Sequence, residues 1–417
     1  MADTPLKRDG IGAPLDTSGF FKLFFGELER REIPCVILHS YEQLPENIAS
    51  DIDFAVPDAD VMKARGVLAE AAAKAGWLIV QTLQYDIASF YTVAVNPQQP
   101  EQFLKLDECS HYTRNGCLFI RDEILLAHRR AFNGFHVPSP SSEFIYTLAK
   151  VFAKGKEIAG YLPRLRELWM QEPKRGEELF HAVFGAEQGT LEAWFGRPAE
   201  LWKSLAKPMH DRNHYRWPQK IREWRRRWQR GSEPTGLRVA ILGADPQLAD
   251  ELGDLLLPCF RRQRVIELFN AAAPDSPPGR GAVGSLLHVN GLFLKSLFSF
   301  WRKEWLAVRR STLVMLVPYF DDLFLHPQRY RICNSNGLIR LLRWFLPQPD
   351  LILAFKNENE SRAEKDSALL HLLSNSPHFH LLVCPDSELP ARAAWKEVVQ
   401  FLARRSRNRD RLPENSP

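Results

Sequence analysis

The order of predicted elements divides this chain of 417 residues into an α+β domain, a helical extension and an α/β domain with a parallel sheet. Residues 18–137 alternate amphipathic helices with short apolar strands, and residues 138–230 have helical periodicity throughout. Residues 237–403 begin with a buried strand of the kind found in parallel sheets. Residues 404–417 are basic and are predicted to form a disordered tail.

The composition indicates an ordinary soluble globular protein, with 45% apolar and 25% charged residues. The excess of 55 Lys and Arg over 50 Asp and Glu is too small to demand a polyanionic partner. Six cysteines without a C-x-x-C pair suit the reduced thiols of a cytosol. The most apolar region, residues 283–320, is interrupted by charges before any run reaches the roughly 20 residues of a membrane span. We therefore expect a cytoplasmic protein that is at most peripheral at the inner membrane.

The elements of residues 18–137 predict a small mixed sheet covered by helices. A helix at 18–31 has a phenylalanine-rich apolar face, and an alanine-rich helix at 58–76 ends at a glycine. The predicted strands lie at 33–38, 50–56, 77–80, 90–95 and 101–107.

The strand at 50–56 carries two carboxylates, Asp51 and Asp53, directly after Ser50. Because alternate residues of a strand point to the same face, the two carboxylates should project together. Mg²⁺ prefers hard oxygen ligands and is commonly held by one or two carboxylates plus substrate phosphates. Asp107, at the end of a later predicted strand, would add a third carboxylate. The alternative is a polar strand end at which Asp51 caps the next element.

The succession of a strand, a small hydroxyl residue, the SDID strand, a helix and a strand with an acid covers roughly residues 20–150. This succession resembles the nucleotidyltransferase superfamily of minimal and antibiotic-modifying type. The resemblance implies a set of metal ligands, which are Asp51, Asp53 and Asp107. It also implies that Ser40 contacts the nucleotide phosphates. His39 stands where the family has glycine, and Asp86 is a weaker candidate for the third carboxylate.

A serine-capped turn at 138–143 predicts the start of the helical extension. Helical patterns follow at 144–156, 162–170, 176–184, 190–195 and 199–205. In the family a helical domain after the catalytic sheet often closes over the nucleotide, so Lys150 joins Ser40 and Ser50 as an expected nucleotide contact. The alternative is a solvated face that Lys150 shares with Lys154 and Lys156.

Residues 216–230 contain seven basic residues and one acid, and their large apolar residues recur at helical spacing. These apolar residues are Trp217, Ile221, Trp224 and Trp228. Such a helix can lie on an anionic membrane surface, bind RNA by charge and stacking, or pack its tryptophans on its own domains. We expect the third arrangement, with the membrane surface next.

The boundary at 231–236 is followed by a strand that runs into Gly243, as in a P-loop. That motif requires a second glycine, a lysine and a hydroxyl residue for the phosphates and Mg²⁺. Those three positions are occupied by Leu248, Ala249 and Asp250. The sequence therefore predicts a degenerate loop marked by Gly243, Asp245 and Asp250.

Three segments of the same half resemble thymidylate kinases, namely 319–331, 338–342 and 347–353. Arg362 stands near the lid arginine of that family, whereas Val317 and Pro318 replace its usual Asp-Arg pair. The resemblance spans about residues 237–403. It implies a P-loop kinase fold without kinase activity.

The fusion of these two halves resembles proteins of bacterial surface-polysaccharide clusters. We expect a Mg²⁺-dependent transfer of NMP from an NTP to a hydroxyl of a small-molecule or glycan-type acceptor. The competing hypothesis is a non-catalytic scaffold or regulatory protein of such a pathway. Nucleic acid is a less favoured partner.

Overall fold

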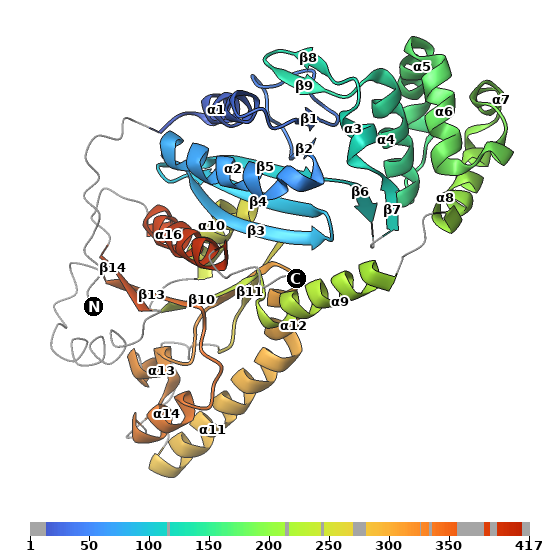
Figure 1. Ribbon diagram of the computed structural model, residues 1–417. Coiled ribbons are helices and arrows are strands. Elements are labelled where there is room, and N and C mark those ends of the chain that lie inside the picture. Colours follow the sequence, from blue (N-terminus) through green and yellow to red (C-terminus); the bar gives the residue numbers. More distant parts are fainter. Residues whose placement is uncertain are drawn as a thin grey trace. The chain divides into compact units, whose positions relative to one another are not determined.

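The computed structural model describes residues 14–114, 117–212, 217–242, 246–269, 281–325, 327–332, 336–356, 379–383 and 390–410 (Figure 1). The described residues form two compact units. Unit 1 contains the residues up to 228 together with those from 406, and unit 2 contains residues 229–405. Each unit is described by itself below.

The sheet of unit 1 has five strands in the order β1-β2-β5-β4-β3. Its strands are β1 (Val36–Ile37), β2 (Ile52–Ala55), β3 (Leu78–Asp86), β4 (Ser89–Asn96) and β5 (Gln99–Cys109). β2 and β5 are parallel, and the other neighbouring pairs are antiparallel. The expected mixed sheet is therefore present, although β1 is shorter than the strand predicted at 33–38.

Two helices, α1 (Thr17–Arg30) and α2 (Val61–Ala75), pack with one face of this sheet in a common apolar core. Phe24 and Phe25 of α1 both contact the ring of Phe54 on β2. Gly76 ends α2 with a φ of 73°, a left-handed conformation that glycine adopts without strain. Because Phe54 faces this core, strand alternation turns Asp53 to the opposite face of the sheet.

The opposite face is covered by the helical part of unit 1, beginning with α4 (Pro140–Ala153). The Ser139 side chain caps α4 by accepting from the Ser142 N–H, as the predicted turn requires. The helices that follow are α5 (Leu162–Gln171), α6 (Pro173–Phe184), α7 (Leu191–Phe195) and α8 (Ala206–Arg212). Residues 199–205, predicted to be α-helical, form a 3₁₀-helix. The described residues between β5 and α4 also contain two short hairpins and α3 (Asp122–Leu126), with strands β6 (Tyr112–Arg114), β7 (Cys117–Ile120), β8 (Arg130–Phe132) and β9 (Phe135–Val137).

The basic helix predicted at 216–230 is α9 (Trp217–Ser232). Ile221, Trp224 and Trp228 are exposed on it. The expectation that this apolar stripe packs on the protein's own domains is therefore wrong for these three side chains. Helical periodicity predicts that these side chains share one side of α9, but it does not specify which surface covers them.

Unit 2 is built on a parallel sheet with the strand order β11-β12-β10-β13-β14. Its strands are β10 (Leu237–Leu242), β11 (Arg262–Ile266), β12 (Thr312–Leu316), β13 (Leu351–Lys356) and β14 (Phe379–Val383). β10 is buried along its whole length, as predicted for a strand in the middle of a parallel sheet. The expectation of a parallel α/β sheet in this half is confirmed.

The helices of unit 2 include α10 (Pro246–Leu256), α11 (Ala282–Ser299), α12 (Trp305–Arg309), α13 (Asp322–Leu325), α14 (Asn336–Arg343) and α16 (Pro390–Asp410), the last of which extends into unit 1. Residues 404–410 continue α16, so the prediction of a disordered tail is wrong for that part. A π-helical segment at Phe300–Glu304 joins α11 to α12.

The continuous helix Ala282–Arg309 is, among the described residues, the one that is long and apolar enough to span a membrane. Lys295, Arg302 and Lys303 interrupt its apolar run, as expected from the sequence, and the helix meets this test by its length and mean hydropathy. Charged residues are sparse enough that the mean hydropathy of the helix stays high. In its most apolar stretch of 18 residues, 22% is buried in the protein.

Candidate active site

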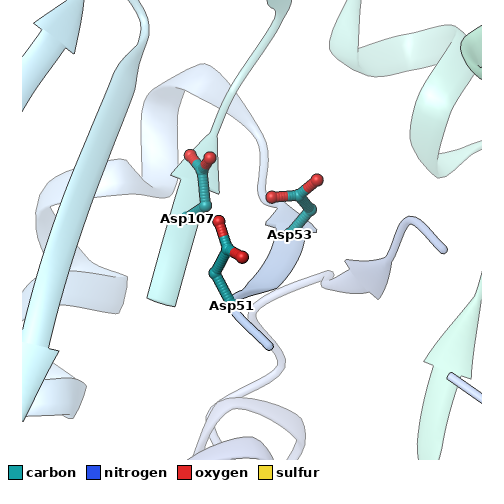
Figure 2. Close-up of side chains that lie close together, drawn as sticks. All are labelled: Asp51, Asp53 and Asp107. Atoms are coloured by element: carbon teal, nitrogen blue, oxygen red, sulfur yellow. The ribbon is translucent and has the colours of Figure 1, made fainter. Parts of the chain in front are cut away.

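Three carboxylates from two neighbouring strands of unit 1 converge on one point (Figure 2). Asp51 lies immediately before β2, while Asp53 on β2 is directly opposite Asp107 on β5. One carboxylate oxygen from each residue lies within 4.8 Å of the other two. Asp51 is exposed, Asp107 is partly exposed and Asp53 is buried, so the cluster is open to solvent at one side.

The position of Asp107 differs from the expectation in one respect. The strand does not end on this acid, because β5 continues to Cys109. Asp107 joins the cluster because parallel pairing places it in register with Asp53. Asp86, the weaker candidate, ends β3, and its carboxylate accepts from the Ile87 N–H at 2.7 Å.

Two cationic or potentially cationic side chains contact the buried carboxylate of Asp53. Lys150 Nζ, from α4, and His39 Nε2, from the loop after β1, both contact Asp53 Oδ2. The Tyr146 hydroxyl lies 3.5 Å from the same oxygen. Burial opposes ionisation of Asp53, but its hydrogen bond to His39 and the charge of Lys150 outweigh burial and lower the pKa of this carboxyl. The contacts with His39 and Lys150 therefore keep Asp53 ionised.

Asp107 has the opposite electrostatic environment. Burial and the neighbouring charge of Asp53 raise the pKa of Asp107 to about 8, although the Tyr85 hydroxyl donates to its Oδ1 at 2.5 Å. At pH 7 the cluster therefore contains one firmly ionised carboxylate, Asp53, and one carboxyl that retains a proton. A bound cation would favour release of that proton, since positive charge stabilises the ionised form.

The serines expected at the nucleotide lie beside the cluster. Ser40 has a φ of 55°, so the left-handed position of this loop is occupied by Ser40 and not by the preceding His39. The Ser40 Oγ lies 2.9 Å from His39 Nδ1, and the Ser50 Oγ lies 3.3 Å from the backbone oxygen of Asp51. His39 therefore faces Asp53 on one side of its ring and Ser40 on the other.

Three side chains of this site were not identified as functional candidates from the sequence. They are His39, Tyr85 and Tyr146. His39 was noted as a replaced glycine, and nothing in the spacing of Tyr85 or Tyr146 distinguishes them from ordinary strand and core residues. Their roles depend on contacts between elements that are far apart in the sequence, such as α4 against β2.

The donor set fits a hard divalent cation. Carboxylate oxygens are the ligands that Mg²⁺ prefers, and Asp51 and Asp107 can offer oxygens on the solvent side of the cluster. Asp53 can also contribute a carboxylate oxygen to such a cation if Lys150 moves away from that carboxylate or contacts it together with the cation. Lys154 lies near Lys150, and burial together with the charge of Lys150 lowers the pKa of Lys154.

The degenerate loop of unit 2 is only partly described. Gly243 and Asp245 lie outside the described residues, as does Arg362. Asp250 is an exposed residue of α10. Ala249 and Asp250 occupy the positions at which a P-loop requires a lysine and a hydroxyl residue.

No family model matches this chain, and no curated protein matches it in sequence. Solved structures with which it shares similarity include a thymidylate kinase from Ehrlichia chaffeensis, at 10% identity and a TM-score of 0.28, covering 42% of this chain and 98% of the kinase. Another is a thymidylate kinase from Candida albicans, at 12% identity and a TM-score of 0.27, covering 42% of this chain and 93% of the kinase.

Proposed function

We propose that unit 1 is a nucleotidyltransferase that uses Mg²⁺ to transfer NMP from an NTP to a hydroxyl group of a small-molecule or glycan-type acceptor. The observation that carries this proposal is the convergence of Asp51, Asp53 and Asp107 within 4.8 Å on adjacent strands. Carboxylates this close repel one another unless positive charge lies between them. Bound Mg²⁺ would supply that charge and would also neutralise the triphosphate of the NTP.

Asp51, Asp53 and Asp107 would hold Mg²⁺, which when bound supplies charge neutralisation at the triphosphate and lowers the pKa of an acceptor hydroxyl. Asp107, whose pKa is raised by burial and by the charge of Asp53, would be the carboxyl that loses a proton on cation binding. Lys150 and His39, which contact Asp53, are placed to turn toward the phosphates and neutralise their charge. The resemblance of residues 20–150 to nucleotidyltransferases supports the same assignment.

A second candidate function is a non-catalytic scaffold or regulatory role in a surface-polysaccharide pathway. One observation favours it: the Lys150 ammonium contacts Asp53 and places a positive charge on it. Such a pair can stabilise a carboxylate pocket that no longer binds metal. The absent P-loop residues of unit 2 are consistent with either function, and neither includes kinase activity.

Peripheral contact through residues 216–230 completes the proposal. Ile221, Trp224 and Trp228 are exposed among arginines, a combination that suits an anionic membrane surface or RNA as the partner of α9. We favour the membrane surface, with the protein on its cytoplasmic side.

Thermal stability in the presence of nucleotides separates the two functions. Ligand at about 100 times its Kd stabilises the folded state by about 2.7 kcal/mol, so a bound Mg²⁺-NTP should raise the melting temperature measurably. We expect at least one of the four common NTPs with Mg²⁺ to do so in the wild type and in Asp211→Ala, a control carboxylate on α8. Asp53→Ala should show no such rise. A wild type that is indifferent to every Mg²⁺-NTP pair would support the scaffold.

A further inference from the structure

The helix formed by α11, the π-helical segment and α12 exposes a continuous apolar stripe. Its exposed members recur every three, four or seven residues, which places them on one side of a helix. They are Val283, Leu287, Leu294, Phe298, Trp301 and Trp305. Leu287 is 71% exposed and Trp301 is 60% exposed. Large apolar side chains in such numbers on one helix face mark an interaction surface.

A second helix adds to this surface. α14 packs beside α11, and Figure 1 shows the two helices next to each other in unit 2. Leu341 on α14 is exposed, as are Trp344 and Phe345 directly after it. Trp344 is 87% exposed, the highest value among the exposed large apolar side chains of the described residues. We call these exposed residues of α11, the π-helical segment, α12 and α14, together with Trp344 and Phe345, the α11–α14 surface.

The exposed charges carried by these two helices are of one sign. Lys295, Arg302 and Lys303 are exposed on the first helix, and Arg340 is exposed on α14. The first helix contains a single acid, Glu304, which is buried and pairs with Arg238 at 2.7 Å. Residues 327–349 contain no acid at all. On the described residues of these two helices, the exposed apolar side chains are therefore accompanied by exposed cationic groups and no exposed acid.

The inner side of the same helix is part of the core of unit 2. Val289 is fully buried there, and the ring of Phe293 lies 6.5 Å from that of Phe320. Insertion of this helix across a bilayer would remove these side chains from the core and expose its remaining residues. The helix can instead lie flat at an interface, with its outer stripe in the lipid and its inner side on the protein.

The chemistry of the α11–α14 surface fits an anionic lipid bilayer. Tryptophan is enriched at the interface between headgroups and acyl chains, and Lys and Arg bind anionic headgroups. A second copy of the chain fits less well, because a two-fold symmetric contact through this surface would place its cationic groups against the same groups of the partner. We propose that the α11–α14 surface docks unit 2 on an anionic membrane, with its apolar stripe inserted in the interfacial layer.

Vesicle co-sedimentation of the full chain tests this proposal. The probes are vesicles of phosphatidylcholine alone and vesicles of phosphatidylcholine and phosphatidylglycerol in equal amounts. We expect binding to the second kind, weakened by salt. Leu287→Asp combined with Trp344→Asp should lower the partition coefficient roughly tenfold or more, because both side chains lose their apolar contact with lipid. Met170→Asp, an exposed apolar residue on α5, should leave binding unchanged and serves as the control.

Both positions of the double variant are exposed, so its melting temperature should equal that of the wild type. Three results would overturn the proposal. The first is that the double variant still binds the vesicles, whereas substitution of Trp224 and Trp228 on α9 abolishes vesicle binding. The second is that the wild type does not bind vesicles and forms a stable dimer by light scattering, while the double variant is a monomer. The third is wild-type protein that resists extraction from vesicles at alkaline pH, which would show a spanning helix.

Discussion

Replacement of Lys150 by methionine tests the electrostatics of the carboxylate cluster. The Lys150 and Asp53 side chains are 18% and 12% exposed, so the pair is largely buried. Removal of one partner of a buried pair costs about 3–5 kcal/mol. His39 remains in contact with Asp53 and the site is partly open, so we expect about 2–3 kcal/mol for Lys150→Met. For a unit of this size that corresponds to a fall in melting temperature of roughly 4–12 °C.

The assay is thermal unfolding in EDTA, followed by the same measurement with Mg²⁺. Lys203→Met is the matched control, because the Lys203 ammonium lies 3.6 Å from Glu157 in an exposed pair whose loss should cost no more than about 0.5 kcal/mol. Mg²⁺ should stabilise Lys150→Met more than the wild type, since the cation replaces the missing positive charge. Asp53→Asn added to Lys150→Met should recover part of the lost stability. Equal melting temperatures for Lys150→Met and Lys203→Met would refute this reasoning.

Three further predictions concern other parts of the chain. The Asp53→Ala substitution removes the nucleotide site proposed for unit 1, so calorimetry on this variant reports on unit 2. We expect no binding of Mg²⁺-ATP, because Asp250 and its neighbours replace the P-loop residues. Tight binding would contradict this. Burial raises the pKa of Glu108 from 4.5 to about 8, so this residue lowers the free energy of unfolding progressively as pH rises between those values. Glu108→Gln should therefore be more stable than the wild type at pH 8, by a few kcal/mol, with no difference below pH 4 in urea unfolding. Trp224→Ser and Trp228→Ser should each change stability by less than about 0.5 kcal/mol, whereas Trp202→Ala, in the core, should cost about 3–5 kcal/mol in the same assay.

The carboxylate cluster was predictable from the sequence because it depends on short-range rules. Strand alternation predicts that Asp51 and Asp53 project together, and the resemblance to nucleotidyltransferases implied Asp107 as the third member. The exact neighbour of Asp53 on β5 depends on strand register, which the sequence does not specify. The prediction therefore named Asp107 correctly as a member of the cluster and misplaced it at the strand end.

The contacts that control the charge of this cluster were much harder to predict. Lys150 was one of three lysines on the same predicted helix, and only the packing of α4 on β2 distinguishes it. The sequence marked His39 only as a replacement for a glycine, whereas its ring contacts both Asp53 and Ser40. Helical periodicity also predicted α9 correctly but gave the wrong environment for Trp224 and Trp228. An apolar stripe shows that a surface is available and does not show what covers it.

Binding of a divalent cation to the three carboxylates is the central claim. Mn²⁺ can replace Mg²⁺ at oxygen ligands and has an electron paramagnetic resonance signal that changes on binding. Titration of the full chain with Mn²⁺, in the presence of a non-hydrolysable NTP, should show a bound ion in the wild type. That ion should be lost in both Asp53→Asn and Asp107→Asn, and retained in the control Asp211→Asn. Equal Mn²⁺ binding by all four proteins, or none by the wild type, would contradict the account.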